Sequence, residues 1–255
     1  MLRIVSLGAG VQSSAMLLMG LHGEFGDVPD AAIFADTTYE PRYVYEWLEF
    51  LKQEAEKLRP GFPIHVVRYH GLRSAEQDVL EAPLHFEGNG ILRRQCTSKW
   101  KVLVLERKAR ELAGLKPGQR VDNPVVETWM GISADEITRM RESTNRWQVL
   151  RYPLIEKRLT RQDCRKWLEC NGYPVPSRSA CWFCPYRGTR EWLELREKDP
   201  DSWEKAVRLD ETIRNTPGFR SRLYLYSKNI PLSKLSELDK QLDLWEDECR
   251  AVCGT

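Results

Sequence analysis

The chain has 255 residues, of which 30% are charged, and its formal net charge is +2. A chain of this length can bury one large core or hold a main domain with a smaller appendix, and we expect the second arrangement. The near balance of charge gives no sign of a strongly basic nucleic-acid binder. We find neither the roughly 18–20 apolar residues of a membrane span nor a secretory signal pattern, so we expect a cytosolic protein without membrane contact.

The first predicted element is a strand over residues 2–7, which leads through a Gly/Ser-rich turn at 8–14 into a helix over 13–21. Glycines let the backbone approach an oxyanion closely, and serines cap a helix or donate to phosphate oxygens. A strand, a glycine turn and a helix N-terminus in this order predict an anion site with phosphate as its ligand. The alternative is a turn that only joins strand to helix.

Short apolar segments then alternate with helical patterns, which predict strands at 31–35, 64–67 and 125–132 and helices at 42–58 and 98–112. This alternation predicts an α/β fold with a mainly parallel sheet and helices on both faces. Ligands of such sheets bind beyond the carboxyl ends of the strands. We therefore expect three turns to meet there: 8–14, Asp36-Thr37-Thr38 and 131–139. The alternative role of Asp36 and its threonines is to cap the next helix.

The character of the sequence changes near residue 160. We predict a nucleotide-binding α/β domain over 1–160 and a smaller, mostly helical module over 161–255, with helices at 161–169, 191–197, 202–214 and 235–250. Between Arg139 and Lys166 nine Lys or Arg residues stand against three acidic ones. This segment is either a solvated face or a surface that binds phosphate or a polynucleotide.

Seven cysteines in a cytosolic protein indicate metal or redox chemistry rather than disulfides. Cys181 and Cys184 form a C-x2-C motif followed by proline, which can hold zinc, hold an iron–sulfur cluster or act as a redox pair. Cys96 lies among four cations, which favour its thiolate: Arg93, Arg94, Lys99 and Lys101.

The remaining cysteines are of two kinds. Cys249 and Cys253 are spaced so that a helix would place both on one face, which makes them further candidate ligands. Cys164 and Cys170 have apolar neighbours in a helical pattern, and we expect them in the core more than at a metal.

Several of these motifs, in this order, resemble one family. The loop Gly8-Ala9-Gly10-Val11-Gln12-Ser13 resembles the S-G-G-x-D-S "PP-loop", with Gly8 for the first serine and Gln12 for the aspartate. The strand ending Asp36-Thr37 resembles the second strand of that family, and residues 93–101 resemble its Arg-x-Cys-Cys-x-x-x-Lys segment with Gln95 for the first cysteine. Residues 131–139 resemble its Gly-Ile/Leu-R-x-x-E-S-x-x-R turn. From Met1 to about Tyr186 the chain thus resembles the phosphoadenylyl-sulfate (PAPS) reductase-like family of the PP-loop ATP pyrophosphatase, or adenine nucleotide alpha hydrolase, superfamily.

The resemblance implies an adenine nucleotide alpha hydrolase-like fold that binds ATP, or another adenine nucleotide, with Mg²⁺. It implies nucleotide-binding roles for residues of the three turns and the first strand: Ser6, Gly8, Ala9, Gly10, Val11, Gln12, Ser13, Ser14, Asp36, Thr37 and Gly131. It implies catalytic roles for Ser13, Asp36, Cys96 and Arg139. Arg139 would clamp a phosphate, although it lies one helical turn from Glu136 and could simply pair with it.

The resemblance also implies a [4Fe–4S] cluster on Cys96, Cys181 and Cys184, with Cys253, or alternatively Cys249, as the fourth ligand or with an open iron site. Zinc is the alternative metal. These features favour an ATP-dependent, pyrophosphate-releasing sulfur-transferase that acts on a nucleic acid, by thiolation of a tRNA base or phosphorothioation of DNA. The alternatives are an adenylyl-sulfate or PAPS reductase and a non-catalytic nucleotide- or nucleic-acid-binding module with structural zinc. The expected partners are a tRNA or DNA substrate and a sulfur donor such as a cysteine desulfurase, and a homodimer is left open.

Overall fold

The computed structural model describes residues 1–88 and 90–235. These residues form two compact units. The first contains residues 1–72 and 97–181, and the second contains residues 73–96 and the chain from 182 onward. The second unit is therefore built from two separate pieces of the sequence.

A five-stranded parallel sheet forms the centre of the first unit, in the order β3-β2-β1-β6-β7. Its strands are β1 (Leu2–Leu7), β2 (Ala31–Asp36), β3 (Ile64–Arg68), β6 (Val126–Met130) and β7 (Gln148–Arg151). All six residues of β2 are buried, as expected for an inner strand that is covered on both faces. The predicted α/β class with a mainly parallel sheet is confirmed.

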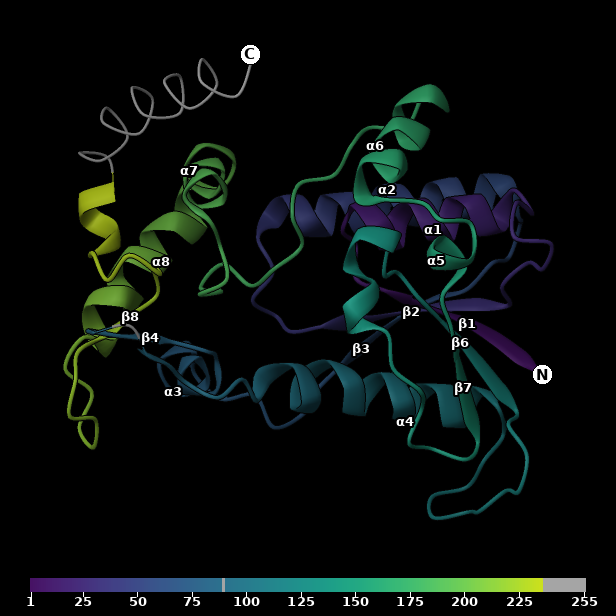
Figure 1. Ribbon diagram of the computed structural model, residues 1–255, viewed down its shortest axis with the longest axis horizontal. Coiled ribbons are helices and arrows are strands. Elements are labelled where there is room, and N and C mark those ends of the chain that lie inside the picture. The colour runs from purple at the N-terminus through teal and green to yellow at the C-terminus, as the bar shows by residue number, and fades with distance from the viewer. Residues whose placement is uncertain (89, 236–255) are drawn as a thin grey trace. The chain divides into compact units, whose positions relative to one another are not determined.

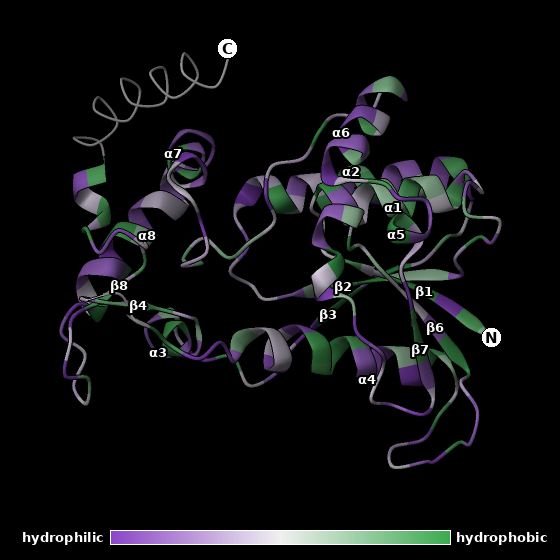
Figure 2. Ribbon diagram, viewed as in Figure 1, coloured by the Kyte–Doolittle hydropathy of each residue, from purple (hydrophilic) through white to green (hydrophobic). Residues whose placement is uncertain are grey.

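Helices cover both faces of this sheet (Figure 1). On one face lie α1 (Val11–Leu21), α2 (Arg42–Leu58), α5 (Pro153–Glu156) and α6 (Arg161–Cys170), and on the other lies α4 (Leu103–Leu112), which follows a π-helical turn over 97–102. Successive strand residues point to opposite faces, so Val5 joins the core under α1 and α2 while Ile4 joins the core under α4. Figure 2 shows both hydrophilic and hydrophobic bands on α2 and α4, which is typical of helices that cover a sheet.

The second unit combines short helices with a small antiparallel sheet in the order β5-β4-β8. Its elements are α3 (Ala75–Asp78), β4 (His85–Phe86), β5 (Gly90–Ile91), α7 (Thr189–Lys198), α8 (Pro200–Ile213) and β8 (Leu223–Tyr224). The fully buried carboxylate of Asp210 accepts hydrogen bonds from the backbone N–H groups of Leu225 (2.8 Å) and Leu232 (3.1 Å) and pairs with Arg214. This one side chain thereby ties α8 to the chain that follows it.

The predicted elements and the observed ones agree closely in the first unit. Helix α2 begins and ends at the predicted residues, and β1, β2 and β3 differ from their predictions by one residue at most. Strand β7 was not predicted, and the predicted helix at 98–112 begins as a π-helical turn. The predicted helix at 235–250 lies outside the described residues except for Leu235.

The division of the chain differs from the expected boundary between residues 160 and 161. Helix α6 follows that position, yet its buried Cys164 and Leu168 belong to the same core as α1 and α2. Residues 73–96, expected within the nucleotide-binding domain, belong instead to the second unit. Within 1–88 and 90–235, no helix combines the length and the apolar character that a membrane crossing requires.

Gly20 lies where α1 packs closely against Trp129 of β6. A Cβ at Gly20 would lie 2.8 Å from Cζ3 of Trp129, a fully buried ring. We predict that Gly20→Ala destabilises the protein, because overpacking costs about 1–3 kcal/mol and the gain in helix propensity returns at most about 1 kcal/mol. Urea unfolding measures the change in the free energy of unfolding.

A double-mutant cycle provides the control for this prediction. In a Trp129→Phe background the smaller ring leaves room for the methyl group, so Gly20→Ala should cost less than in the natural protein. An equal cost in both backgrounds would place the strain elsewhere.

Candidate functional site

The loop between β1 and α1 gathers backbone N–H groups around one point. The N–H groups of Gly8 and Gly10 donate to the same atom, Oγ of Ser13, at 3.2 and 3.3 Å, and this hydroxyl donates back to the carbonyl of Gly10. Ala9 between them has a φ of 55°, in the left-handed region. Two N–H groups that converge on one oxygen at a helix N-terminus are what an anion site requires. In this structure the Ser13 hydroxyl holds that position.

The other predicted loop residues have different surroundings. Ser14 is fully buried and its Oγ accepts a hydrogen bond from the indole of Trp47 on α2 (2.9 Å). Val11 is part of the hydrophobic core, and Ser6 is half-buried on β1. These contacts hold the loop and the helix in place.

The turn after β6 lies directly against the start of α1. A Cβ at Gly131 would lie 2.8 Å from Cα and 3.0 Å from the backbone nitrogen of Ser13, so only glycine lets the two backbones approach this closely. The side-chain amide of Gln12 donates to Oγ of Ser133 (3.3 Å) and to Oε2 of Glu136 (2.9 Å). Gln12, which stands where the resembled family has an acid, therefore connects the loop to the carboxylate of Glu136.

Arg139 is 60% exposed and its guanidinium pairs with Oε1 of Glu136 at 2.6 Å. The sequence left two arrangements open for Arg139, a phosphate clamp or an ion pair with Glu136, and the structure shows the ion pair. The result is a chain of contacts from Arg139 through Glu136 to Gln12 at the first turn of α1. The role of Arg139 as a phosphate clamp stays a prediction.

Asp36 lies at the carboxyl end of β2 and is almost completely buried. Its Oδ1 accepts hydrogen bonds from the N–H of Thr38 (2.7 Å) and the hydroxyl of Tyr45 (2.8 Å), and its Oδ2 pairs with Arg68 at the end of β3 (2.7 Å). Burial and then the hydrogen bond to Asp36 raise the pKa of Tyr45 well above its ordinary value, so Tyr45 remains a donor. Both oxygens of Asp36 thus have partners within the protein.

Glu40, four residues after Asp36, has one carboxylate oxygen with hydrogen-bond partners and, among the described residues, one without. Its side chain is fully buried, and its Oε1 accepts from Lys101 (3.1 Å) and from the hydroxyl of Thr37 (3.5 Å). Its Oε2 is buried and has no hydrogen-bond partner within the described part of the chain. A buried carboxylate oxygen without a partner is costly unless a ligand supplies a donor or a cation.

The segment that ends the first unit places a serine and a cysteine beside these turns. Cβ of Ser179 lies 3.8 Å from where a Cβ on Gly10 would be, and its buried Oγ has no hydrogen-bond partner in the ranges 1–88 and 90–235. Cys181 lies two residues further, and its Sγ is 3.3 Å from Oγ1 of the fully buried Thr37. The structure therefore brings the predicted metal ligand Cys181 to the edge of the sheet that carries the glycine loop.

The other cysteines are distributed over both units. Cys96 and Cys184, both half-buried, belong to the second unit. Among the residues that the structure describes, no three or more His, Cys, Asp or Glu side chains form a group that could hold a metal ion. Cys249 and Cys253 lie outside the described residues. Cys164 is buried as expected, whereas Cys170 is exposed at the end of α6 rather than in the core.

Sequence reasoning missed several members of this site. Arg68 could have been found, because it directly follows a predicted strand just as Asp36 does. Lys101 belonged to the cationic segment around Cys96 but was not assigned to the nucleotide site. Glu40 and Ser179 carry no local signal, since only the folded chain brings them to the sheet edge.

Comparisons with known proteins give one kind of match. No protein-family model matches the chain, and no curated protein is significantly similar to it in sequence. Among solved structures, a crystal structure of PAPS reductase from Candida auris in complex with phosphate is similar, with 14% sequence identity and a TM-score of 0.44 over 71% of this chain and 81% of that one. At this identity the similarity concerns the arrangement of strands and helices.

Two cysteines on α6 provide a test of the environments described here. Burial raises the pKa of Cys164 to about 12, and the thiolate is the reactive form, so Cys164 is almost entirely protonated and unreactive at pH 8. We predict that iodoacetamide at pH 8 alkylates the exposed Cys170 while Cys164 stays unmodified until the protein is unfolded. Peptide mass mapping measures both sites in one sample, and equal labelling of the two in the folded protein would contradict the buried position of Cys164.

Proposed function

We propose that this protein is an ATP-dependent, pyrophosphate-releasing sulfur-transferase that acts on a nucleic acid. One observation carries the proposal. A loop with converging N–H groups, Gly8 to Gly10, lies at the carboxyl edge of a parallel sheet, and the thiol of Cys181 is held at that same edge by Thr37. A phosphate cradle and a thiol at one site suit chemistry that activates with a nucleotide and then transfers sulfur.

In the first step the loop would bind the phosphates of ATP, with the hydroxyl of Ser13 turning away or donating to a phosphate oxygen. An oxygen of the acceptor attacks the α-phosphorus, a new P–O bond forms, and the bond to the β-phosphate oxygen breaks to release pyrophosphate. Negative charge on the phosphate oxygens is then stabilised by the N–H groups of Gly8 and Gly10. Arg139 could add a cation after leaving Glu136.

Glu40 is the residue that we propose to bind Mg²⁺ or the ribose of the nucleotide. Its unpartnered Oε2 is suited to Mg²⁺ or to a sugar hydroxyl, while Asp36 fixes the turn through Thr38, Tyr45 and Arg68. Lys101 balances the charge of Glu40 from the other side. Asp36 in this proposal positions the binding turn, and Glu40 faces the ligand.

In the second step a sulfur nucleophile attacks the adenylated centre, a bond to sulfur forms, and AMP leaves with the acceptor's former oxygen. The sulfur comes from a donor such as a cysteine desulfurase, which supplies it as the outer sulfur of a persulfide. After this sulfur has displaced AMP, it is still joined to its carrier by a disulfide bond. A second thiol then attacks the carrier sulfur, the S–S bond breaks to release the thiolated acceptor, and an external dithiol reduces the disulfide that is left. In the protein without a cluster, Cys181 is the thiol at the site that accepts this sulfur; with a cluster bound, Cys181 is instead one of the cluster's ligands. A [4Fe–4S] cluster, when bound, would supply a site for the transferred sulfur, and we propose Cys96, Cys181 and Cys184 as ligands with Cys253 or Cys249 as the fourth.

The nucleotide site is tested by Gly10→Val. Gly10 has an extended backbone (φ −100°) that valine adopts readily, and a Cβ there would make an ordinary 3.8 Å contact with Ser179. We predict a folded protein that has lost binding of ATP, AMP and adenylyl sulfate in isothermal titration, because the branched side chain fills the space over the N–H groups.

Gly188→Val is the matched control, since Gly188 is also an extended residue at a helix N-terminus and a Cβ there would lie 3.9 Å from its nearest neighbour, Oε2 of Glu191. This variant should bind like the natural protein. Normal binding by Gly10→Val, or the absence of nucleotide binding by the natural protein at millimolar concentration, would mean that the loop is not the site.

Single Cys→Ser variants at Cys96, Cys181 and Cys184 test the cluster, with the exposed Cys170→Ser as control. After anaerobic reconstitution we predict loss of iron, labile sulfide and the visible absorption band in the first three and full retention in the control. Retention by Cys96→Ser would remove it from the ligand set. Zinc without sulfide in the natural protein would favour the structural-metal alternative, and adenylyl-sulfate reduction without pyrophosphate release would favour a reductase.

A further inference from the structure

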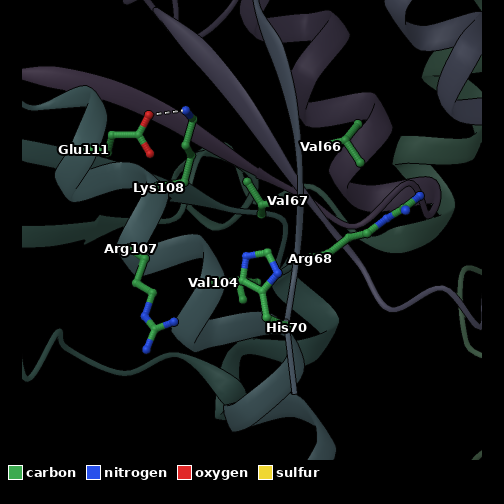
Figure 3. A pocket seen from close by; sticks show the side chains of 8 residues that line it. All are labelled: Val66, Val67, Arg68, His70, Val104, Arg107, Lys108 and Glu111. Atoms are coloured by element: carbon green, nitrogen blue, oxygen red, sulfur yellow. Dashed lines mark hydrogen bonds and ion pairs between the residues drawn. The ribbon is translucent and has the colours of Figure 1, made fainter. Parts of the chain in front are cut away.

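A cleft of about 610 Å³ lies between β3 and α4 in the first unit. Its walls come from residues at the edge of the sheet and from one side of the helix (Figure 3): Val66, Val67, Arg68, His70, Val104, Arg107, Lys108 and Glu111. Because β3 is the outermost strand of the sheet, its outer row of backbone N–H and C=O groups faces this side. None of these residues belongs to the sites predicted from the sequence.

The charges of the cleft are unequal. Three cationic side chains stand against the single carboxylate of Glu111, which pairs with Lys108 at 2.5 Å. Arg68 pairs with Asp36, but only through Nε. Arg107 and His70 are exposed, and neither has a hydrogen-bonding or ionic partner within 1–88 and 90–235. The cleft therefore offers unpaired nitrogen donors and is suited to an anionic ligand.

The direction of the side chains favours an elongated ligand over a small anion. Figure 3 shows Arg107 projecting from α4, whereas Arg68 extends to the other side of β3, away from the α4 side chains. The residues that line the cleft therefore continue around the edge of the sheet. Arg68, at one end of the cleft, forms an ion pair with Asp36 beside the candidate nucleotide site. A free phosphate needs donors that converge on one point, and these donors diverge.

Exposed apolar surface accompanies the cations. Val66 is 41% exposed and lies on the same side of β3 as Arg68, away from the α4 side chains (Figure 3). Valine side chains can contact sugars and unstacked bases. A single strand has such bases accessible, whereas a duplex keeps them stacked inside. Phosphate contacts from cations and backbone N–H groups with apolar contacts between them match the chemistry of a single strand.

We propose that the cleft between β3 and α4 binds the phosphodiester backbone of a single-stranded segment of nucleic acid and leads it around the sheet edge toward Asp36. Arg107 and Lys108 bind phosphates, and Arg68 marks the passage to the nucleotide site. That the strand is the acceptor rests on the function proposed above. Binding of the strand itself does not require nucleotide.

The test is fluorescence anisotropy without ATP, with a fluorescein-labelled single strand of about 12 nucleotides, within the range covered by one binding domain, as DNA and as RNA. The variant is Arg107→Gln with Lys108→Gln. Its matched control is Lys205→Gln with Arg208→Gln, an equal change of charge at exposed positions on α8. Each phosphate contact contributes about 0.7 to the slope of log affinity against log salt, so the cleft variant should lower that slope by about 1.4, and the control should leave it unchanged.

Several outcomes would overturn the proposal: an unchanged slope in the cleft variant, an equal decrease in the control, or complete displacement of the strand by inorganic phosphate at constant ionic strength. Arg107→Gln alone, with half of the expected decrease, guards against misfolding of the double variant. Failure of the proposed function is distinguishable, because it would abolish pyrophosphate release while strand binding by the cleft persists.

Discussion

The close approach of Gly131 to Ser13 is the constraint on which the site depends. Parallel pairing of β1 with β6 brings the end of one strand beside the turn that follows the other, and the missing side chain at Gly131 lets the two backbones nearly touch. Ser13 is then held where its hydroxyl gathers the N–H groups of Gly8 and Gly10. Gln12, the preceding residue, is aimed at Glu136 by the same contact. The shape of the loop and the arrangement of charge around it thus depend on one glycine.

Polar groups at the sheet edge divide into those that build the turns and those that are left for a ligand. Asp36 belongs to the first kind, because its two oxygens meet three donors from three segments. Glu40 and Ser179 belong to the second, because each keeps a buried oxygen without a partner within the described chain. Ala9 and Thr38 both have a positive φ. Ala9 lies in the turn after β1, and Thr38 lies in the turn after β2. Strained backbone and unsatisfied oxygens in the same place are typical of a site organised before its ligand arrives.

Patterns of local sequence predicted most of the first unit and the two long helices of the second, α7 and α8, but not the small antiparallel sheet. The spacing of Trp47, Leu48 and Leu51 fixes the buried face of α2, and apolar runs mark β1 to β3, so period and composition were sufficient. Strand β7 has only four residues and its pattern is half polar, and β4 is defined by pairing with β8 far along the chain. Ligands of parallel sheets bind beyond the carboxyl ends of the strands, and this rule was sufficient to place the glycine loop, Asp36 and Gly131 at one edge of the sheet. It could not find Glu40 or Ser179, whose roles arise from tertiary contacts.

The two-piece construction of the second unit has a consequence for synthesis on the ribosome. Phe86 of β4 pairs with Leu223 of β8, and at roughly 5–20 residues per second the intervening chain takes roughly 7–27 s to emerge. The first unit receives its last strand at Arg151, well before then. During that interval the segment 73–96 lacks α8 and β8, and its Val79, Ala82 and Leu84, buried in the finished fold, have no core of their own to enter. The nascent chain therefore passes through a stage at which the parallel sheet carries an apolar segment whose packing partners have not yet been made.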